Sequence, residues 1–171
     1  MKTKKIQVLP YDPQWKENFQ TIRQELSLAL NGLALRIEHV GSTSVEGLAA
    51  KPIIDIDVVI SDHTPLESVV AALSAIGYQH EGDLGIPQRE AFRYDAKPHL
   101  QKHHLYVCPE SSPELRRHSV FRDHLRSHPE AAAEYGRVKM EAALLYPEDI
   151  DNYLQYKGTI IKRIHIQAGL Q

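Results

Sequence analysis

Residues 39–60, HVGSTSVEGLAAKPIIDIDVVI, join a Gly-Ser turn to an apolar strand that contains two aspartates. A strand that is apolar on both faces is usually central in a sheet covered on both sides. An unpaired carboxylate in such a strand is costly, so Asp55 and Asp57 need neighbours that balance their charge. The stretch therefore predicts a central strand that also carries part of a site.

The two aspartates are separated by one residue, so their side chains project from the same face of the strand, roughly 6 to 7 Å apart. At an effective dielectric constant of about 20, their charges repel by about 2 to 3 kcal/mol. A divalent cation, a shared proton or nearby basic groups can relieve this repulsion. Magnesium (or manganese) fits best, because it accepts one or two protein carboxylates and takes its other ligands from water and phosphate. In the alternative interpretation, both aspartates lie at the exposed strand end and pair with Lys51 or Arg93.

Gly41 and Ser42 directly follow a predicted strand. A glycine at this position lets backbone N–H groups approach a phosphate, and the serine adds a hydroxyl group. Thr43 and Ser44 complete the predicted phosphate- or nucleotide-binding turn. An ordinary turn is the alternative. A phosphate-binding turn followed about a dozen residues later by an acid pair predicts a site for a metal and a polyphosphate.

The rest of the chain predicts a mixed α/β (α+β) fold in one domain, residues 1–171. Asp12 and Pro13 begin a helix whose apolar residues recur at three- and four-residue spacing. A second helix is predicted over 64–77, and strands are predicted at 5–11, 34–40, 51–60, 78–82, 90–96 and 103–109. Three helices follow, two of them opened by Pro113 and Pro129. We expect a mixed β-sheet core over about 1–110 and a helical layer over about 112–168.

Composition excludes several classes of protein. The chain is 42% hydrophobic and 25% charged with a formal net charge of −2, so no specific nucleic acid is expected as a partner. No apolar run approaches the roughly 18 residues of a membrane span. The single cysteine, Cys108, excludes an internal disulfide framework and favours a reducing, cytoplasmic location.

The stretch HVGSTSVEGLAAKPIIDIDVV resembles the signature of the GrpB-like family. Further shared pieces are YDPQW at 11–15, HHLYV at 103–107, FRDHLRSHPE at 121–130, and the pair Tyr153 and Lys157. The resemblance implies the nucleotidyltransferase superfold of polymerase-beta type. It also implies an association with coenzyme A biosynthesis, because a similar domain is fused to dephospho-coenzyme A kinase in some chains. Carried over, the glycine-serine motif of the superfold falls on Gly41 and Ser42, and its metal-binding acids fall on Asp55 and Asp57.

Two departures from the family pattern concern the site. Members of the superfold commonly carry a third carboxylate on a later strand, where this chain has HHLYV with His103, His104 and Tyr106. We expect His104 to replace the missing base, because a histidine can accept a proton near neutral pH. Glu46 occupies a position at which the family usually has proline.

Three basic residues are predicted to contact phosphate or an anionic substrate: Lys51, Arg89 and Arg93. Arginine can hold phosphate through two parallel hydrogen bonds. Solvated surface charges are the alternative for each of them. The many histidines lack a metalloprotease pattern and most are expected to be surface or packing residues.

These features favour a metal-dependent nucleotidyl- or phosphoryl-transferase acting on a nucleotide or another phosphorylated small molecule. In this hypothesis Asp55 and Asp57 hold the metal, the turn binds phosphate, and His104 serves as the base. The first alternative is a non-catalytic domain that binds a nucleotide or a coenzyme A-type ligand. The second is an interaction partner of a larger protein, with the helical layer as its surface.

Overall fold

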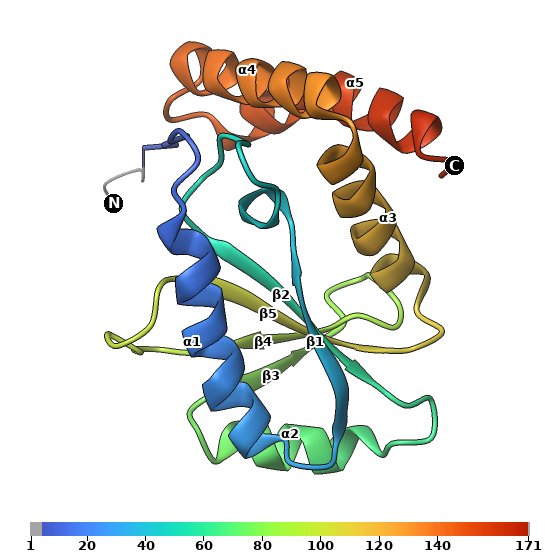
Figure 1. The fold of residues 1–171 in the computed structure, drawn as a ribbon. Coiled ribbons are helices and arrows are strands. Elements are labelled where there is room, and N and C mark those ends of the chain that lie inside the picture. Colours follow the sequence, from blue (N-terminus) through green and yellow to red (C-terminus); the bar gives the residue numbers. More distant parts are fainter. Residues whose placement is uncertain (1–4, 171) are drawn as a thin grey trace.

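The computed structural model describes residues 5–170, which form one sheet and its surrounding helices (Figure 1). The helices are α1 (Gln14–Ala29), α2 (Leu66–Ser74), α3 (Pro113–Ser127), α4 (Pro129–Leu145) and α5 (Ile150–Gln167). The strands are β1 (Ala34–Val40), β2 (Ile54–Ile60), β3 (Gln79–Gly82), β4 (Glu90–Arg93) and β5 (His103–Pro109), and a 3₁₀ turn, η1, spans Ser42–Ser44.

The sheet has the strand order β1-β2-β5-β4-β3. β2 and β5 run parallel, and the other neighbouring strands run antiparallel. In the parallel pair, Asp55 lies beside His104 and Asp57 lies beside Tyr106. The prediction of a mixed α/β fold is therefore confirmed, and β2 is an interior strand that lies between β1 and β5.

One face of the sheet packs against α1 and α2. The apolar residues of α1 that recur along one side of the helix, Trp15, Phe19, Ile22 and Leu26, are all buried there. They join Ile54, Ile56 and Val58 of β2 in the main core cluster. Because β2 alternates, its aspartates project from the opposite face. The apolar face thus fixes the direction in which the acid pair points.

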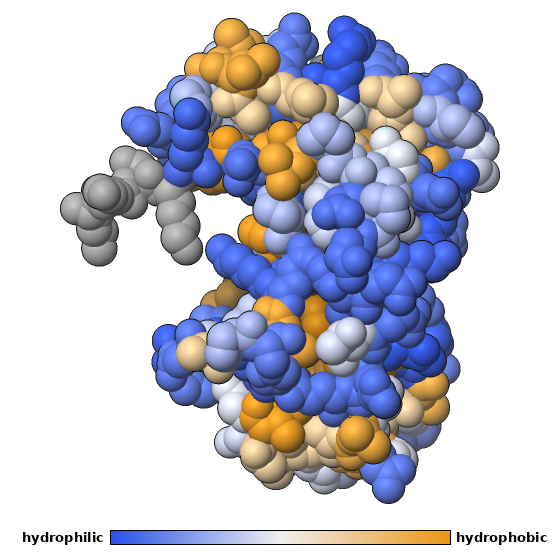
Figure 2. Space-filling model, turned by 60° about the vertical axis from the view of Figure 1, so that its left-hand side comes forward, coloured by the Kyte–Doolittle hydropathy of each residue, from blue (hydrophilic) through white to orange (hydrophobic). Residues whose placement is uncertain are grey.

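The helical layer covers the end of the sheet at which β2 begins. In Figure 1, α4 and α5 lie across the top of the molecule, and α3 leads down from them along the side of the sheet. A second core cluster joins these helices to the chain between η1 and β2, through Val45, Leu48, Leu125 and Tyr135. Figure 2 shows that the outline narrows below this layer, where hydrophilic side chains predominate.

The strand predicted at 5–11 is wrong. The structure has only a single β-bridge between Leu9 and Ala50, in which each N–H donates to the other residue's carbonyl. Pro10 follows directly and has no N–H with which to continue the pairing. Within residues 5–170, no helix is long and apolar enough to cross a membrane.

Candidate functional site

Asp55 and Asp57 lie on the same face of β2 but in different surroundings. The Asp55 side chain is one-third exposed, whereas that of Asp57 is fully buried. Oδ1 of Asp55 accepts a hydrogen bond from Nδ1 of His104 on the adjacent strand, at 3.0 Å. Since this bond fixes a proton on Nδ1, Nε2 of His104 is left as the proton-accepting atom of the ring.

Gly41 lies directly against Asp55. Its φ is +72°, and a Cβ atom added at this position would collide with Oδ2 of Asp55 and come within 3.0 Å of the Asp55 Cβ and Cγ atoms. The glycine therefore lets the backbone pass close to a carboxylate. The space on the Cβ side of Gly41 is taken by Asp55, and the role of Gly41 in phosphate binding stays a prediction.

Asp57 is held by a histidine from α3. Its Oδ2 accepts from Nδ1 of His118 at 2.6 Å, and Nε2 of His118 lies 3.3 Å from a carboxylate oxygen of Glu114. Burial alone would lower the pKa of His118, but the hydrogen bond and charge of Asp57 raise it. Burial raises the pKa of Asp57, and the bond with His118 opposes that rise. With a carboxylate at each ring nitrogen, the pair is best described as imidazolium and carboxylate.

Replacing His118 by alanine should destabilise the protein by about 2 to 3 kcal/mol, because Asp57 would remain buried without its counter-ion. Chemical denaturation at neutral pH measures the change. The double change Asp57→Asn with His118→Ala is the control and should recover part of the loss, since a buried amide costs less than a buried charge. Equal stability of wild type and His118→Ala would contradict the ion pair.

Three lysines converge on the exposed side of Asp55. A cavity of about 180 Å³ separates the start of β2 from α4 and α5, and we call it the lysine cavity. Lys51 precedes β2, while Lys139 and Lys157 come from α4 and α5. The lining of the cavity includes Ser42, Lys51, Asp55, Lys139, Tyr153 and Lys157. Among the residues that the structure describes, none of the three lysines forms an ion pair with an acid.

Burial lowers the pKa of all three lysines in the lysine cavity. The Lys139 side chain is buried, and burial together with the charges of Lys157 and Lys51 places its pKa well below the ordinary value. Burial and Lys51 lower the pKa of Lys157 to about 8. Burial also lowers the pKa of Lys51, against the attraction of Asp55. A bound anion would oppose the effect of burial and raise the pKa values of these amines.

The three lysine amines form cation–π contacts with tyrosine rings. Nζ of Lys139 lies 4.4 Å from the centre of the Tyr135 ring, and Lys51 and Lys157 lie 5.2 and 4.8 Å from that of Tyr153. The hydroxyl groups of Tyr135 and Ser42 are hydrogen-bonded to each other. The buried Tyr153 hydroxyl has no hydrogen-bond partner within the described chain. Tyr153 thus contributes its ring to the surroundings of two amines in the cavity.

The hydroxyl groups of Thr43 and Ser44 are already hydrogen-bonded within the protein. The Thr43 hydroxyl pairs with Nε2 of the buried His39 at 2.9 Å, and the Ser44 hydroxyl donates to the carbonyl of Gly41. Of the hydroxyl-bearing residues in the turn, Ser42 and Thr43 line the lysine cavity. Glu46 is exposed and lines a different cavity with Tyr11 and Arg126.

The two predicted arginines also lie outside the lysine cavity. Arg89 stacks on the Tyr106 ring, 4.3 Å from its centre, and its Nε is buried without a partner in the described residues. Arg93 is exposed, and its Nε donates to Gln79 at 2.9 Å. Of the predicted site residues, the lining of the lysine cavity thus includes Ser42, Thr43, Lys51, Asp55 and His104, and it does not include either arginine.

Asp55 and Asp57 are the carboxylates that would hold the predicted magnesium ion. Oδ1 of Asp57 is buried and has no hydrogen-bond partner in residues 5–170, while Asp55 is partly exposed on the same face. No group of three or more His, Cys, Asp or Glu side chains in this range could hold a metal. Two carboxylates suffice for magnesium only if substrate oxygens and water supply the remaining ligands.

From the sequence, Lys139 and Lys157 are expected either to form the far wall of a pocket or to pack the C-terminal helices, and His118 has no predicted role in the site. A usable signal exists for the lysines, because each occupies the buried stripe of its helix. Lys139 follows Tyr135 by four residues, and Lys157 follows Tyr153 by four, with Ala142 and Ile160 next on the two stripes. A lysine on an apolar stripe is rarely buried unless it has a role.

The chain is similar in sequence to several known proteins. The Bacillus subtilis protein YqkA is 33% identical over 159 residues, covering 93% of the chain and 46% of the relative. A dephospho-CoA kinase of Mycolicibacterium paratuberculosis is 30% identical over 175 residues, covering 89% of the chain and 43% of the kinase. The chain thus spans less than half the length of these two relatives.

Solved structures extend the comparison to the fold. The crystal structure of the conserved protein GrpB from Enterococcus faecalis superposes with a TM-score of 0.82 at 36% identity, covering 95% of this chain and 96% of that one. The Cid1 poly(U) polymerase with bound MgGTP gives a TM-score of 0.53 at 13% identity, covering 77% of this chain and 42% of that one. At this identity Cid1 supports the nucleotidyltransferase-like fold alone.

The model of the family described as GrpB protein matches residues 5–167, nearly the whole chain. This range includes the turn after β1, the acid pair on β2 and the lysines of α4 and α5. The chain belongs to the GrpB family.

Proposed function

We propose that the chain binds the polyphosphate of a nucleotide-like substrate in the lysine cavity and transfers a nucleotidyl or phosphoryl group from it. One observation carries this proposal: three lysines without acidic partners in the described chain converge beside Ser42 and Asp55. A polyphosphate would supply the missing negative charge. In a space shielded from water, each ammonium–phosphate contact is stronger than at a surface.

The cavity is too small for a whole nucleotide. Ligand sites for molecules of drug size usually exceed about 300 Å³, whereas the lysine cavity has about 180 Å³. Phosphate groups would therefore enter it, and the nucleoside would stay outside. The cavity would therefore recognise the polyphosphate rather than a particular base.

Asp55 and Asp57 would hold magnesium (or manganese) at the edge of the cavity. When bound, the ion neutralises charge on the phosphates and helps to fix their position. The protein would supply two carboxylates, Asp55 and Asp57, from the same face of β2. Asp55 is partly exposed, and Oδ1 of Asp57 is buried without a hydrogen-bond partner in the described residues.

His104 would accept the proton of an attacking hydroxyl group. Asp55 holds Nδ1–H, so the lone pair of the ring is at Nε2. A positioned histidine of this kind contributes about 10²- to 10⁴-fold to a rate. His104 would thus act as the base on the strand where members of the superfold commonly carry a third carboxylate.

Transfer can be tested with nucleoside triphosphates labelled at the α-phosphate, in the presence of magnesium and a panel of hydroxyl acceptors. Asp55→Asn should reduce product formation at least about 100-fold, since it removes both a metal ligand and the partner of His104. Asp57→Asn should do the same while circular dichroism shows that the fold remains. Asp151→Asn, at an exposed position of α5, is the matched control. Unchanged turnover in Asp55→Asn would contradict the proposal.

A second candidate function is non-catalytic binding of a nucleotide or a coenzyme A-type ligand. Asp57 favours it, because this side chain is fully buried and already paired with His118. A relative of part of the chain is named dephospho-CoA kinase, so dephospho-coenzyme A belongs in the ligand panel. Calorimetric binding without product from any triphosphate and acceptor would select this candidate. Neither binding nor product would leave a protein-interaction role.

A further inference from the structure

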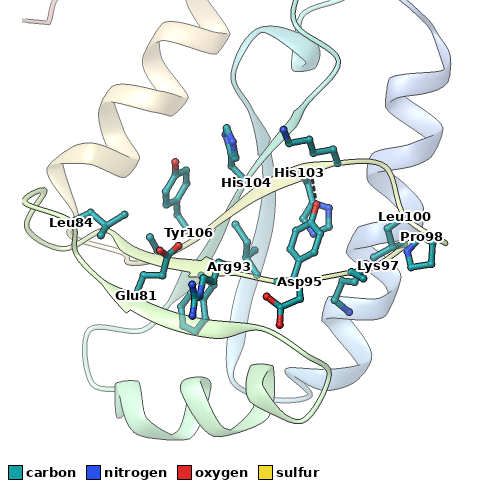
Figure 3. A pocket seen from close by; sticks show the side chains of 16 residues that line it. Glu81, Leu84, Arg93, Asp95, Lys97, Pro98, Leu100, His103, His104 and Tyr106 are labelled. Carbon is teal, nitrogen blue, oxygen red and sulfur yellow. Dashed lines mark hydrogen bonds between the residues drawn. The ribbon is translucent and has the colours of Figure 1, made fainter. Parts of the chain in front are cut away.

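A second and larger cavity, of about 650 Å³, lies on the open part of the sheet beside the lysine cavity. We call it the acceptor cavity and define it by Glu81, Leu84, Arg93, Lys102, His104 and Tyr106. Figure 3 shows His104 and Tyr106 projecting to the same side of β5. His104 lines both cavities, so a molecule in one and a phosphate in the other would meet at this ring.

Two basic residues, Arg93 and Lys102, line the acceptor cavity together with His104. In the antiparallel pair of β4 and β5, Ala91 lies opposite Tyr106 and Phe92 lies opposite Leu105. If the same register continues by one residue, Arg93 lies opposite His104. Lys102 is two residues before His104, and its charge contributes to lowering the pKa of Lys51. Neither Arg93 nor Lys102 forms an ion pair with an acid in the part of the chain that the structure describes.

The lining of the acceptor cavity also includes the acidic Glu81 and the apolar Leu84. The charge of Glu81 acts on Tyr106, whose hydroxyl group has a raised pKa mainly because of burial. Leu84 is 60% exposed and adopts a φ of +51°, which is uncommon for a residue with a side chain. Backbone strain of this kind is maintained only where the surroundings fix it, and it is frequent at ligand sites.

The size and charge of the cavity indicate a small molecule. Its volume lies within the range of about 300 to 1,000 Å³ that is typical of small-molecule sites. Its lining contains Glu81 and Asp95 as well as Arg93, Lys97 and Lys102, and the whole chain has a net charge of −2. Binding of a polynucleotide requires a continuous basic track along its phosphates, and this mixture does not supply one.

We propose that the acceptor cavity binds the acceptor of the transfer reaction, a small hydroxylated molecule with a carboxylate or phosphate group that contacts Arg93 and Lys102. This inference rests on the proposed function. The acceptor oxygen forms a bond to phosphorus of the substrate in the lysine cavity. The bond from that phosphorus to the leaving phosphate oxygen breaks, its electron pair stays on the leaving group, and the hydroxyl proton passes to Nε2 of His104.

Nuclear magnetic resonance of the full chain tests this subsite. The probes are glycerate, gluconate and glycerol 3-phosphate, with glycerol and sorbitol as uncharged counterparts. Each is added with and without a saturating non-hydrolysable ATP analogue, so that phosphate binding to the lysines is separated from binding at the sheet. At least one anionic probe should shift the ring signals of His104 and Tyr106 when the analogue is present, and its uncharged counterpart should not.

Variants at Arg93 make the test specific. Arg93→Glu should weaken binding of the anionic probe by about tenfold or more, because an attractive charge becomes repulsive. Arg93→Lys keeps the charge and should remain within about threefold of wild type. No shift with any probe, equal shifts with the uncharged compounds, or unchanged binding in Arg93→Glu would overturn the inference. If the ATP analogue does not shift the signals of Lys139 and Lys157, the proposed function is contradicted. Binding of the probes at the acceptor cavity is measured separately, from the signals of Tyr106.

Discussion

Replacing Lys139 by methionine should make the ligand-free protein more stable and abolish its binding of polyphosphate. The amine is buried, and burial with two neighbouring lysines depresses its pKa. Methionine fills a similar volume without an amine to desolvate, so a gain of about 1 to 2 kcal/mol is expected. For a chain of this length, such a gain raises the melting temperature by about 2 to 8 °C.

The pH dependence of stability provides a second signature of Lys139. An unfolded lysine binds a proton below a pH of about 10.4, whereas the buried amine does so only at lower pH. The unfolded state then binds more protons, so wild-type stability falls as pH decreases from that value toward the folded pKa. Lys139→Met lacks this contribution. Thermal unfolding of both proteins between pH 7 and 10 measures the difference.

Lys162→Met is the matched control, because Lys162 is exposed on the same helix as Lys157. It should leave stability and triphosphate affinity nearly unchanged, while Lys139→Met lowers affinity by at least about 100-fold through the loss of a buried, charge-assisted contact. If Lys139→Met lost stability and kept its affinity, the lysine would have a packing role and no ligand role.

Replacing Gly41 by alanine should be costly for both stability and binding. Its φ of +72° and ψ of −175° are accessible almost only to glycine, and the added methyl group would collide with Asp55. The backbone strain alone costs about 1 to 3 kcal/mol. Displacement of Asp55 should in addition remove magnesium-dependent binding of triphosphate, which calorimetry measures.

Gly47→Ala separates the two causes. Gly47 also has a positive φ, +84°, but a Cβ atom there would have no neighbour within 4 Å. The Gly47→Ala variant should lose stability because of backbone strain and should retain triphosphate binding. Equal effects of the two substitutions on binding would mean that the contact between Gly41 and Asp55 has no part in the site.

Much of the fold is readable from local pattern. The apolar run around Asp55 and Asp57 predicts a central strand, and their spacing of two places them on one face, as in β2. Trp15, Phe19 and Ile22 recur at helical spacing and are buried under the sheet. Each of these features depends only on the period of side chains along one element.

The rest of the site depends on which elements meet. Lys139 and Lys157 are more than eighty residues from Asp55 in the sequence, and only the packing of α4 and α5 over β2 brings them together. Likewise, the role of Gly41 is decided by the approach of Asp55 from the neighbouring strand. Local sequence pattern carries little information about such contacts between elements.

The most direct test of the account is a calorimetric titration of the full chain with ATP, inorganic triphosphate and adenosine, each with and without magnesium. If the lysines and the acid pair form a polyphosphate receptor, ATP and inorganic triphosphate will bind with similar affinity, magnesium will strengthen both, and adenosine will not bind. Tight binding of adenosine, or no heat with either triphosphate at millimolar concentration, would contradict the account.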